Sequence, residues 1–147
     1  MENSLNINCN YFDVTDFNNY FLNGSQEILL THLNVRSFNR NSDQFIAFID
    51  RLNLRAQLMC FTETWFKQDS IAEITGYNSF HSCRNEDKIG GGVSIYISQD
   101  FKSVLLSDIS FVSDVIEICS VKVAIGNESI YVLGIYRPPY KAKLLEF

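Results

Sequence analysis

The chain has 147 residues, 46% of them hydrophobic, and its 17 acidic and 12 basic side chains give a net charge of −5. This length and apolar content indicate one globular domain, and twelve Phe and seven Tyr against two Pro favour a β-rich interior over a disordered chain. The acidic balance excludes binding of nucleic acid through a general basic surface, because that mode neutralises many phosphates with cations. An acidic nuclease can still act through local contacts and a bound metal ion.

The first part of the chain separates a leader from the main fold. Residues 1–26 are rich in Asn and weakly periodic, so we expect a leader outside the main fold, in part disordered, followed by the domain over residues 27–147. Residues 27–33 contain a short apolar run that is typical of a buried strand, and residues 34–41 are polar enough to form the loop that follows.

An amphipathic helix of about three turns is predicted next, with Ser42 as its N-cap. Its apolar side chains fall at helical spacing: Phe45, Ile46, Ile49 and Leu52. Residues 58–62 then return as an apolar strand, which completes a β-α-β unit with two parallel strands in one sheet. Asn34 and Glu63 are therefore expected to leave the same edge of that sheet.

The rest of the chain predicts a β meander. Strands are expected at residues 77–83, 93–98, 103–106, 115–124 and 129–136, with a polar turn at residues 84–88 and a hairpin turn at residues 126–128. Val93, Ile95 and Ile97 alternate on one face of their strand. The run Gly90-Gly91-Gly92 precedes a strand and does not lead into a helix, so we expect a turn there and no phosphate-binding loop.

The cysteines and the N-terminal sequence indicate the cellular compartment of the protein. Cys9, Cys60, Cys83 and Cys119 are far apart and form no C-x-x-C pair, so reduced, mostly buried thiols are expected. No apolar stretch reaches the roughly 18 to 20 residues of a membrane span, and the N-terminus lacks the basic and apolar segments of a signal peptide. We therefore expect an intracellular protein, nuclear or cytoplasmic, without a membrane partner.

Glu63 is the residue that points most directly to chemistry. It follows an apolar strand-like run, and open α/β sheets place their ligand sites at the carboxyl ends of such strands. Cleavage of a phosphodiester uses a divalent ion, and Mg²⁺ takes oxygen ligands from one or two carboxylates and water. Taken singly, the residues fit other interpretations: Glu63 as a solvated or capping carboxylate, Asn34 as a turn residue and Tyr136 as a sheet aromatic.

Three segments, in this order, make a family resemblance. They are H-L-N-V-R-S at residues 32–37, T-E-T-W at residues 62–65 and I-Y-R-P-P at residues 135–139. Together they resemble the endonuclease domain of non-LTR (LINE-type) retrotransposons, a branch of the endonuclease/exonuclease/phosphatase superfamily. The resemblance covers residues 28–139. It implies an α/β (α+β) fold, the N-terminal half of a four-layer α/β/β/α sandwich.

The same resemblance implies roles for single residues. Glu63 would be a principal ligand of Mg²⁺, with Mn²⁺ as a substitute, Asn34 would orient the metal and the phosphate, and Tyr136 would place a hydroxyl near the scissile phosphate. Five cations fall in predicted loops, where a solvated surface is the default and a DNA-facing rim is the alternative: Arg36, Arg40, Arg84, Lys88 and Arg137. Arg36 and Arg137 are the two taken as candidate DNA contacts. The implied partner is DNA, nicked for target-primed reverse transcription by a parent protein with a downstream reverse transcriptase domain.

The second half of the family domain supplies a G-D-F-N type segment and an S-D-H type segment, and neither occurs in this sequence. The resemblance therefore implies an incomplete site and little or no nicking by this chain alone. We also expect the inner face of a single sheet to be open to water, which would favour self-association or marginal stability. The residues expected there are Val93, Ile95, Ile97, Val121, Val123 and Val132.

Two hypotheses of different classes follow. The first is the N-terminal fragment of a Mg²⁺-dependent endonuclease, and the second is a non-catalytic remnant or repurposed binding module of retroelement origin. In-frame codons for the two missing segments after Phe147 would favour the first, and stop codons or frameshifts the second. A phosphoesterase for small molecules or lipids fits the three segments less well, because their sequences resemble those of the retroelement branch.

Overall fold

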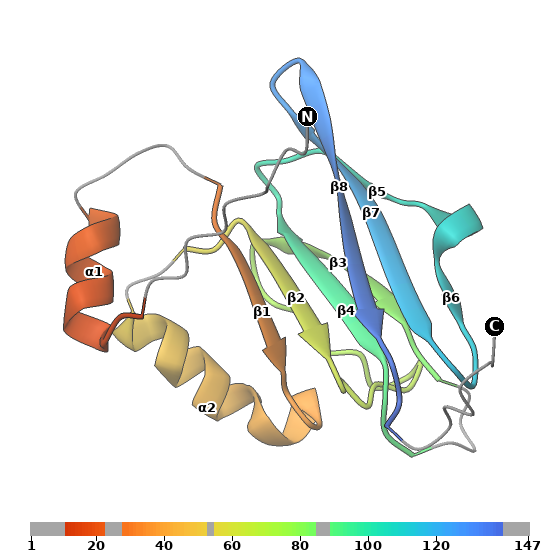
Figure 1. Ribbon diagram of the computed structural model, residues 1–147. Helices are drawn as coiled ribbons and strands as arrows, with labels where there is room; N and C mark the ends of the chain where they lie inside the picture. Colours follow the sequence, from red (N-terminus) through yellow and green to blue (C-terminus); the bar gives the residue numbers. More distant parts are fainter. Residues whose placement is uncertain (1–10, 23–27, 53–54, 85–88, 140–147) are drawn as a thin grey trace, which may run out of the picture.

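The computed structural model describes residues 11–22, 28–52, 55–84 and 89–139. Two β-sheets lie face to face, and the helices lie on the outer side of the first sheet (Figure 1). The described part of the chain thus has three layers, helix, sheet and sheet. No described helix is both long and apolar enough to cross a membrane.

The first sheet contains four strands in the order β1-β2-β4-β3. Their bounds are β1 (Leu30–Asn34), β2 (Leu58–Thr62), β3 (Tyr77–Ser82) and β4 (Val93–Ser98). Strands β1 and β2 run parallel and are connected through helix α2 (Phe38–Arg51), so the predicted β-α-β unit is confirmed. The predicted bounds of β2 and β4 are also those of the structure.

The second sheet is built around β7 (Glu117–Ile125), with which β5 (Ser103–Leu105), β6 (Phe111–Val112) and β8 (Glu128–Tyr136) all pair antiparallel. The predicted hairpin between β7 and β8 is confirmed, with Ile125 opposite Glu128. Its turn includes Gly126 at φ 58°, a left-handed conformation that glycine adopts without steric cost. The sequence did not predict β6 or the 3₁₀ turn η1 (Ser107–Ile109) before it.

The main core lies between the two sheets. Its members come from β2, β4, β7 and β8: Leu58, Cys60, Val93, Ile95, Ile97, Cys119, Val121, Val123 and Val132. Gly134 marks the closest approach, because a Cβ atom there would lie 2.6 Å from Val93 Cγ1 and 2.8 Å from Cys60 Sγ. The sheets therefore pack directly on each other at this glycine.

This packing corrects the expectation of a single sheet with an open inner face. The six valines and isoleucines predicted to face water are at most 7% exposed. The prediction was wrong because the second half of the chain forms its own sheet, whose inner face covers that of the first. What stays exposed is the outer face of β8, with Tyr131 60%, Leu133 48% and Ile135 53% exposed.

An aromatic cluster fills the space between α2 and the outer face of the first sheet. Phe38 and Phe45 of α2 pack on Phe61 and Tyr96, with ring centroids 5.1 Å apart for Phe38 and Phe61 and 4.9 Å for Phe45 and Phe61. Phe61 and Tyr96 are both 0% exposed. The central strands β2 and β4 of the first sheet are therefore buried on both faces.

Helix α2 begins earlier than predicted. Its N-cap position is Ser37 and not Ser42, and its first residue, Phe38, is 3% exposed. The loop after β2 supplies the reason, because the backbone oxygens of Glu63 and Thr64 accept hydrogen bonds from the N–H groups of Ser37 and Phe38 at 2.8 and 2.9 Å. These tertiary bonds satisfy donors that a helix start otherwise leaves open.

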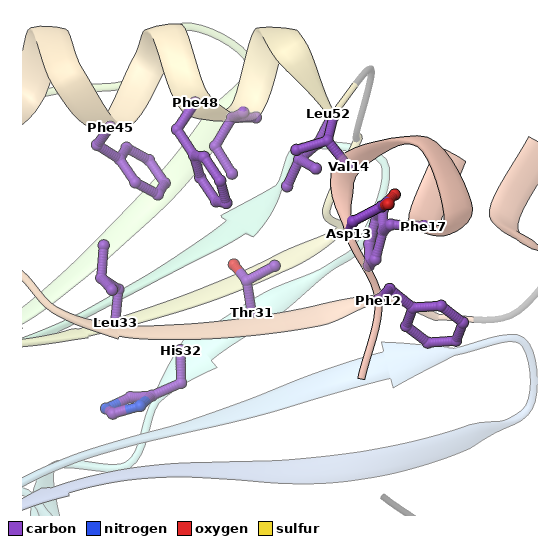
Figure 2. Close-up of a pocket in the computed structure, with 11 residues that line it drawn as sticks. Phe12, Asp13, Val14, Phe17, Thr31, His32, Leu33, Phe45, Phe48 and Leu52 are labelled. Carbon is purple, nitrogen blue, oxygen red and sulfur yellow. The ribbon is translucent and has the colours of Figure 1, made fainter. Parts of the chain in front are cut away.

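Helix α1 (Val14–Leu22) lies in the predicted leader and was not predicted. It sits beside α2 and β1, and a cavity of about 580 Å³ lies among the three elements. Figure 2 shows Phe45 and Phe48 above Thr31 and Leu33 in this cavity, with Phe17 at one end.

Beyond Arg84, the turn predicted at residues 84–88 falls outside the described residues.

Candidate active site

Glu63 is the first residue after β2 and occupies a left-handed turn. Its φ is 58°, and that of Trp65 is also 58°. Side-chain-bearing residues in this conformation are strained and persist when their surroundings hold them. Here the N–H groups of Thr64 and Trp65 bond the backbone oxygens of Gly92 and Gly91, at 3.3 and 2.9 Å. The glycine run before β4 thus holds the turn in place.

Three donors converge on the half-buried carboxylate of Glu63. The hydroxyl of Tyr136 donates to Oε1, and the indole Nε1–H of Trp65 donates to Oε2 at 2.5 Å. The N–H of Gly91 also donates to Oε2, at 3.1 Å. Donors from β8, from the turn after β2 and from the glycine run therefore surround one carboxylate.

These contacts decide the protonation of both partners. Burial raises the pKa of Glu63, but the hydrogen bonds from Tyr136, Trp65 and Gly91 and the positive charge of Arg84 outweigh it and lower the pKa below its ordinary value. Burial and the bond to Glu63 raise the pKa of Tyr136 to about 12. At neutral pH the site thus pairs an ionised carboxylate with a protonated phenol.

Asn34 ends β1 and is exposed. In the parallel register it lies opposite Thr62, the residue before Glu63, and the N–H of Val35 bonds the oxygen of Thr62 at 3.0 Å. The prediction that Asn34 and Glu63 leave the same edge of the sheet is therefore confirmed. Arg36, at φ 40°, follows in the turn before α2, and Arg137 directly follows Tyr136. Both arginines are exposed.

Sequence reasoning missed Glu117 as a site residue and placed its partner Arg84 in a solvated or DNA-facing loop, whereas the Arg84 side chain is 15% exposed and paired with Glu117. Glu117 is 0% exposed at the start of β7, its Oε1 forms an ion pair with Nε of Arg84, and its Oε2 accepts the N–H of Gly92 at 2.5 Å. A signal was present: Glu117 shares the inward face of β7 with Cys119, Val121 and Val123. A carboxylate at an inward strand position is rarely buried without a partner.

The possible metal ligands at this site meet part of what a hydrated Mg²⁺ ion requires. Glu63 offers an ionised carboxylate near the exposed end of β1, and Mg²⁺ usually keeps several waters and takes one or two carboxylates beside the phosphates of its substrate. Within the described ranges there is no group of three or more His, Cys, Asp and Glu side chains that could enclose an ion. The fit is therefore to an ion held through one carboxylate, with water and substrate as the remaining ligands.

No protein-family model matches the chain, and comparison with curated proteins gives no match. The structure is similar to the endonuclease domain of TRAS1, a telomere-specific non-LTR retrotransposon, with a TM-score of 0.54 and 14% identity over 76% of this chain and 46% of that one. It is also similar to the 3′ phosphatase NExo from Neisseria bound to product DNA hairpin, with a TM-score of 0.46 and 16% identity over 71% and 40% of the two chains.

The chain therefore spans less than half the length of either solved structure. The mixed α/β architecture is the one that the motifs at residues 32–37, 62–65 and 135–139 predicted, whereas the second sheet facing the first was not predicted for this part of the domain. The chain has the endonuclease/exonuclease/phosphatase fold, as the similarity to the TRAS1 endonuclease domain shows.

Proposed function

We propose that this chain is part of a Mg²⁺-dependent DNA endonuclease of the retrotransposon type, which nicks target DNA by hydrolysis of a phosphodiester bond. The observation that carries the proposal is the contact between Tyr136 and Glu63. Two residues named by separate motifs, one from each sheet, meet at an ionised carboxylate on a fold shared with the TRAS1 endonuclease domain. A reverse transcriptase domain downstream in an intracellular parent protein belongs to the same proposal.

In this proposal Glu63 would hold Mg²⁺, or Mn²⁺ in its place, and the ion would supply polarisation of the phosphoryl group and stabilisation of the leaving oxyanion. Asn34, exposed at the same edge, orients the metal or the phosphate through its side-chain amide. Tyr136 keeps its proton, and because a phenol donates only one hydrogen bond, its hydroxyl would turn from Oε1 of Glu63 to donate to the scissile phosphate when DNA binds. Arg36 and Arg137, both exposed beside these residues in the chain, contact the DNA backbone.

We further propose that this chain alone does not cleave DNA. Hydrolysis also needs a general base for the attacking water. His81 does not fit, because burial lowers its pKa to about 4 and its ring packs edge-on to Phe66 and Tyr96, with Nδ1 bonded to the hydroxyl of Ser94 at 2.8 Å. The similarity to only 46% of the TRAS1 domain supports a base supplied by a further segment.

Paramagnetic broadening by Mn²⁺ tests the metal site at residue level. We expect Mn²⁺ to broaden the NMR signals of the Gly91 amide and the Trp65 indole first, since both groups donate to Glu63. Excess Mg²⁺ should restore the signals. Glu63→Gln should abolish the local broadening, and the matched control Glu128→Gln, an exposed carboxylate at the start of β8, should keep it. Broadening that is uniform or unchanged in Glu63→Gln would refute the metal site.

A plasmid assay tests the second part of the proposal. Supercoiled DNA incubated with the chain and Mg²⁺ is expected to stay supercoiled. A Mg²⁺-dependent nick that disappears in Glu63→Ala would contradict the proposed lack of cleavage and would support the nuclease function. A nick that persists in Glu63→Ala would point to a contaminating enzyme.

The second candidate function is a non-catalytic binding module of retroelement origin. The observation in its favour is the exposed apolar row Tyr131, Leu133 and Ile135 on the outer face of β8. We propose a second copy of the chain as its partner, since exposed apolar rows of this kind favour association. Sedimentation equilibrium should then show a dimer that Leu133→Glu dissociates, and a clean monomer at all concentrations would count against this candidate.

A further inference from the structure

The glycine run before β4 presents two consecutive amides to two different carboxylates. The N–H of Gly91 donates to Oε2 of Glu63 at 3.1 Å, and the N–H of Gly92 donates to Oε2 of Glu117 at 2.5 Å. Gly91 and Gly92 have φ values of 74° and 90°, in the left-handed region. Successive N–H groups in such a turn form a concavity that binds anionic groups. Here the two anions are side chains of the protein itself.

Both carboxylate oxygens of Glu117 have a partner at this turn, the N–H of Gly92 and the guanidinium of Arg84. Its carboxylate is 0% exposed and is shared between Gly92 and Arg84, whose side chain is 15% exposed. Apolar residues of similar volume often replace a buried ion pair without loss of stability. Stability therefore does not explain why an ion pair occupies this position. A role in fixing the geometry of the turn explains it.

The turn has little room to move. A Cβ atom on Gly91 would overlap the side chains of Arg84 and Glu117, and one on Gly92 would lie 2.5 Å from Thr64 Oγ1. The ion pair thus contacts the turn on one side, and the residues after Glu63 contact it on the other. Displacement of Gly92 would also move the N–H of Gly91 relative to Glu63, because the two N–H groups belong to successive peptide groups joined at the Cα of Gly91.

We propose that Glu117 is a positioning residue for Glu63. Together with Arg84 it fixes the Gly91–Gly92 peptide and thereby the Cα of Gly91, so that the N–H of Gly91 in the preceding peptide stays on Oε2 of Glu63 and holds the carboxylate in a single orientation, with Oε1 toward Tyr136. Arg84 also contributes a positive charge that favours the ionised form of Glu63. The role of Glu63 as a metal ligand rests on the proposed function, whereas the control of its orientation does not.

The test replaces the ion pair by apolar residues of similar volume, Arg84→Met with Glu117→Leu. We expect the variant to fold with a melting temperature lower by several degrees, because packing is kept and no charge is left unpaired, while the buried N–H of Gly92 loses its acceptor. The dissociation constant of Mn²⁺ should rise about ten- to hundredfold, the usual effect of losing a residue that orients a metal ligand. Glu128→Gln serves as the matched control and should change neither quantity.

A metal-free readout separates this inference from the proposed function. Hydrogen exchange at the Gly91 amide should accelerate in the paired variant, and the emission of Trp65, the single tryptophan of the chain, should shift because its indole shares Oε2 of Glu63. If the native chain does not bind Mn²⁺, the proposed function fails while these two signals still test the positioning role. A folded paired variant with native exchange at Gly91 and native Trp65 emission would overturn the inference.

Glu117→Asp decides the question if the paired variant does not fold. This variant keeps a negative charge beside Arg84. Its side chain is one methylene group shorter, so the carboxylate lies farther from the N–H of Gly92. Faster exchange at Gly91, measured against amides in the centre of β4, would support the inference. Exchange at Gly91 equal to that of the native chain would overturn it.

Discussion

The hydroxyl of Tyr136 donates a hydrogen bond to Oε1 of Glu63 across 73 positions of the sequence. Tyr136 ends β8 in the second sheet, and Glu63 follows β2 in the first. The contact therefore exists only while the two sheets face each other, and the candidate site depends on the sheet-on-sheet core beneath it (Figure 1).

Removal of the hydroxyl should change the titration of Glu63. Tyr136→Phe deletes one of the donors that lower the pKa of Glu63, so this pKa should rise while the half-buried carboxylate stays in place. The side-chain carboxyl shift of Glu63, followed by NMR against pH, measures the change. Tyr131→Phe, at the 60% exposed Tyr131 of the same strand, is the control and should leave the titration as it is.

The stability of the chain should fall on mild acidification because of His81. Burial lowers the pKa of His81 from 6.5 to about 4, and its buried Nε2 has no partner among the described residues. Between these two pH values the unfolded chain binds a proton that the folded chain does not, so the free energy of unfolding decreases as pH falls from 6.5 to about 4.

Denaturant unfolding at several pH values measures this slope. His81→Phe should flatten it, since phenylalanine keeps the aromatic contacts with Phe66 and Tyr96 and carries no titratable group. His32→Gln changes the other, exposed histidine and should preserve the slope. A slope of native size in His81→Phe would assign the pH dependence to other groups.

Gly134→Ala should destabilise the chain by about 1–3 kcal/mol, the usual cost of one extra methyl group in a packed core. The added Cβ would lie 2.6 Å from Val93 Cγ1, where the two sheets meet. Leu133→Ala, at a side chain 48% exposed on the outer face of the same strand, should cost much less. Equal effects of the two changes in thermal unfolding would contradict the close packing of the sheets at Gly134.

Phe38→Ala should cost about 3–5 kcal/mol, because it empties the centre of the aromatic cluster. Phe38 is 3% exposed and lies next to Phe45, Phe61, Phe66 and Tyr96. This loss is a large fraction of the roughly 5–15 kcal/mol that stabilises a typical domain. Urea unfolding measures it, and Phe48→Ala on the same helix, at a side chain 50% exposed, should have a much smaller effect.

Local patterns were enough to predict most of the strands and the site residues that follow them. The apolar run at residues 58–62 and the alternation at residues 93–98 define β2 and β4, because the pattern of a strand depends on residues that are neighbours in the sequence. Since parallel strands end at the same edge, the β-α-β pattern also predicted that Asn34 and Glu63 lie at one edge. The metal and DNA roles of these residues, and those of Tyr136, Arg36 and Arg137, stay predictions.

Other features escaped sequence reasoning because distant contacts decide them. Helix α2 starts at Phe38 because backbone groups after β2 cap it, and the hydroxyl group of Ser42 is not needed. The burial of Glu117 depends on Arg84, 33 positions away, and on the N–H of Gly92, 25 positions away. The local sequence pattern around a carboxylate in a strand does not show whether the carboxylate is hydrated or is buried against an arginine.

The sequence by itself determined the approximate positions of most strands and of the β7–β8 hairpin turn, because hydrophobic periodicity and glycine conformations act over a few neighbouring residues. Only the tertiary structure decided that the strands divide into two sheets that bury each other's inner faces. The same packing brings Tyr136, Trp65 and the Gly91–Gly92 turn around Glu63. These outcomes depend on contacts between segments far apart in the chain, and no local pattern specifies which segments will meet.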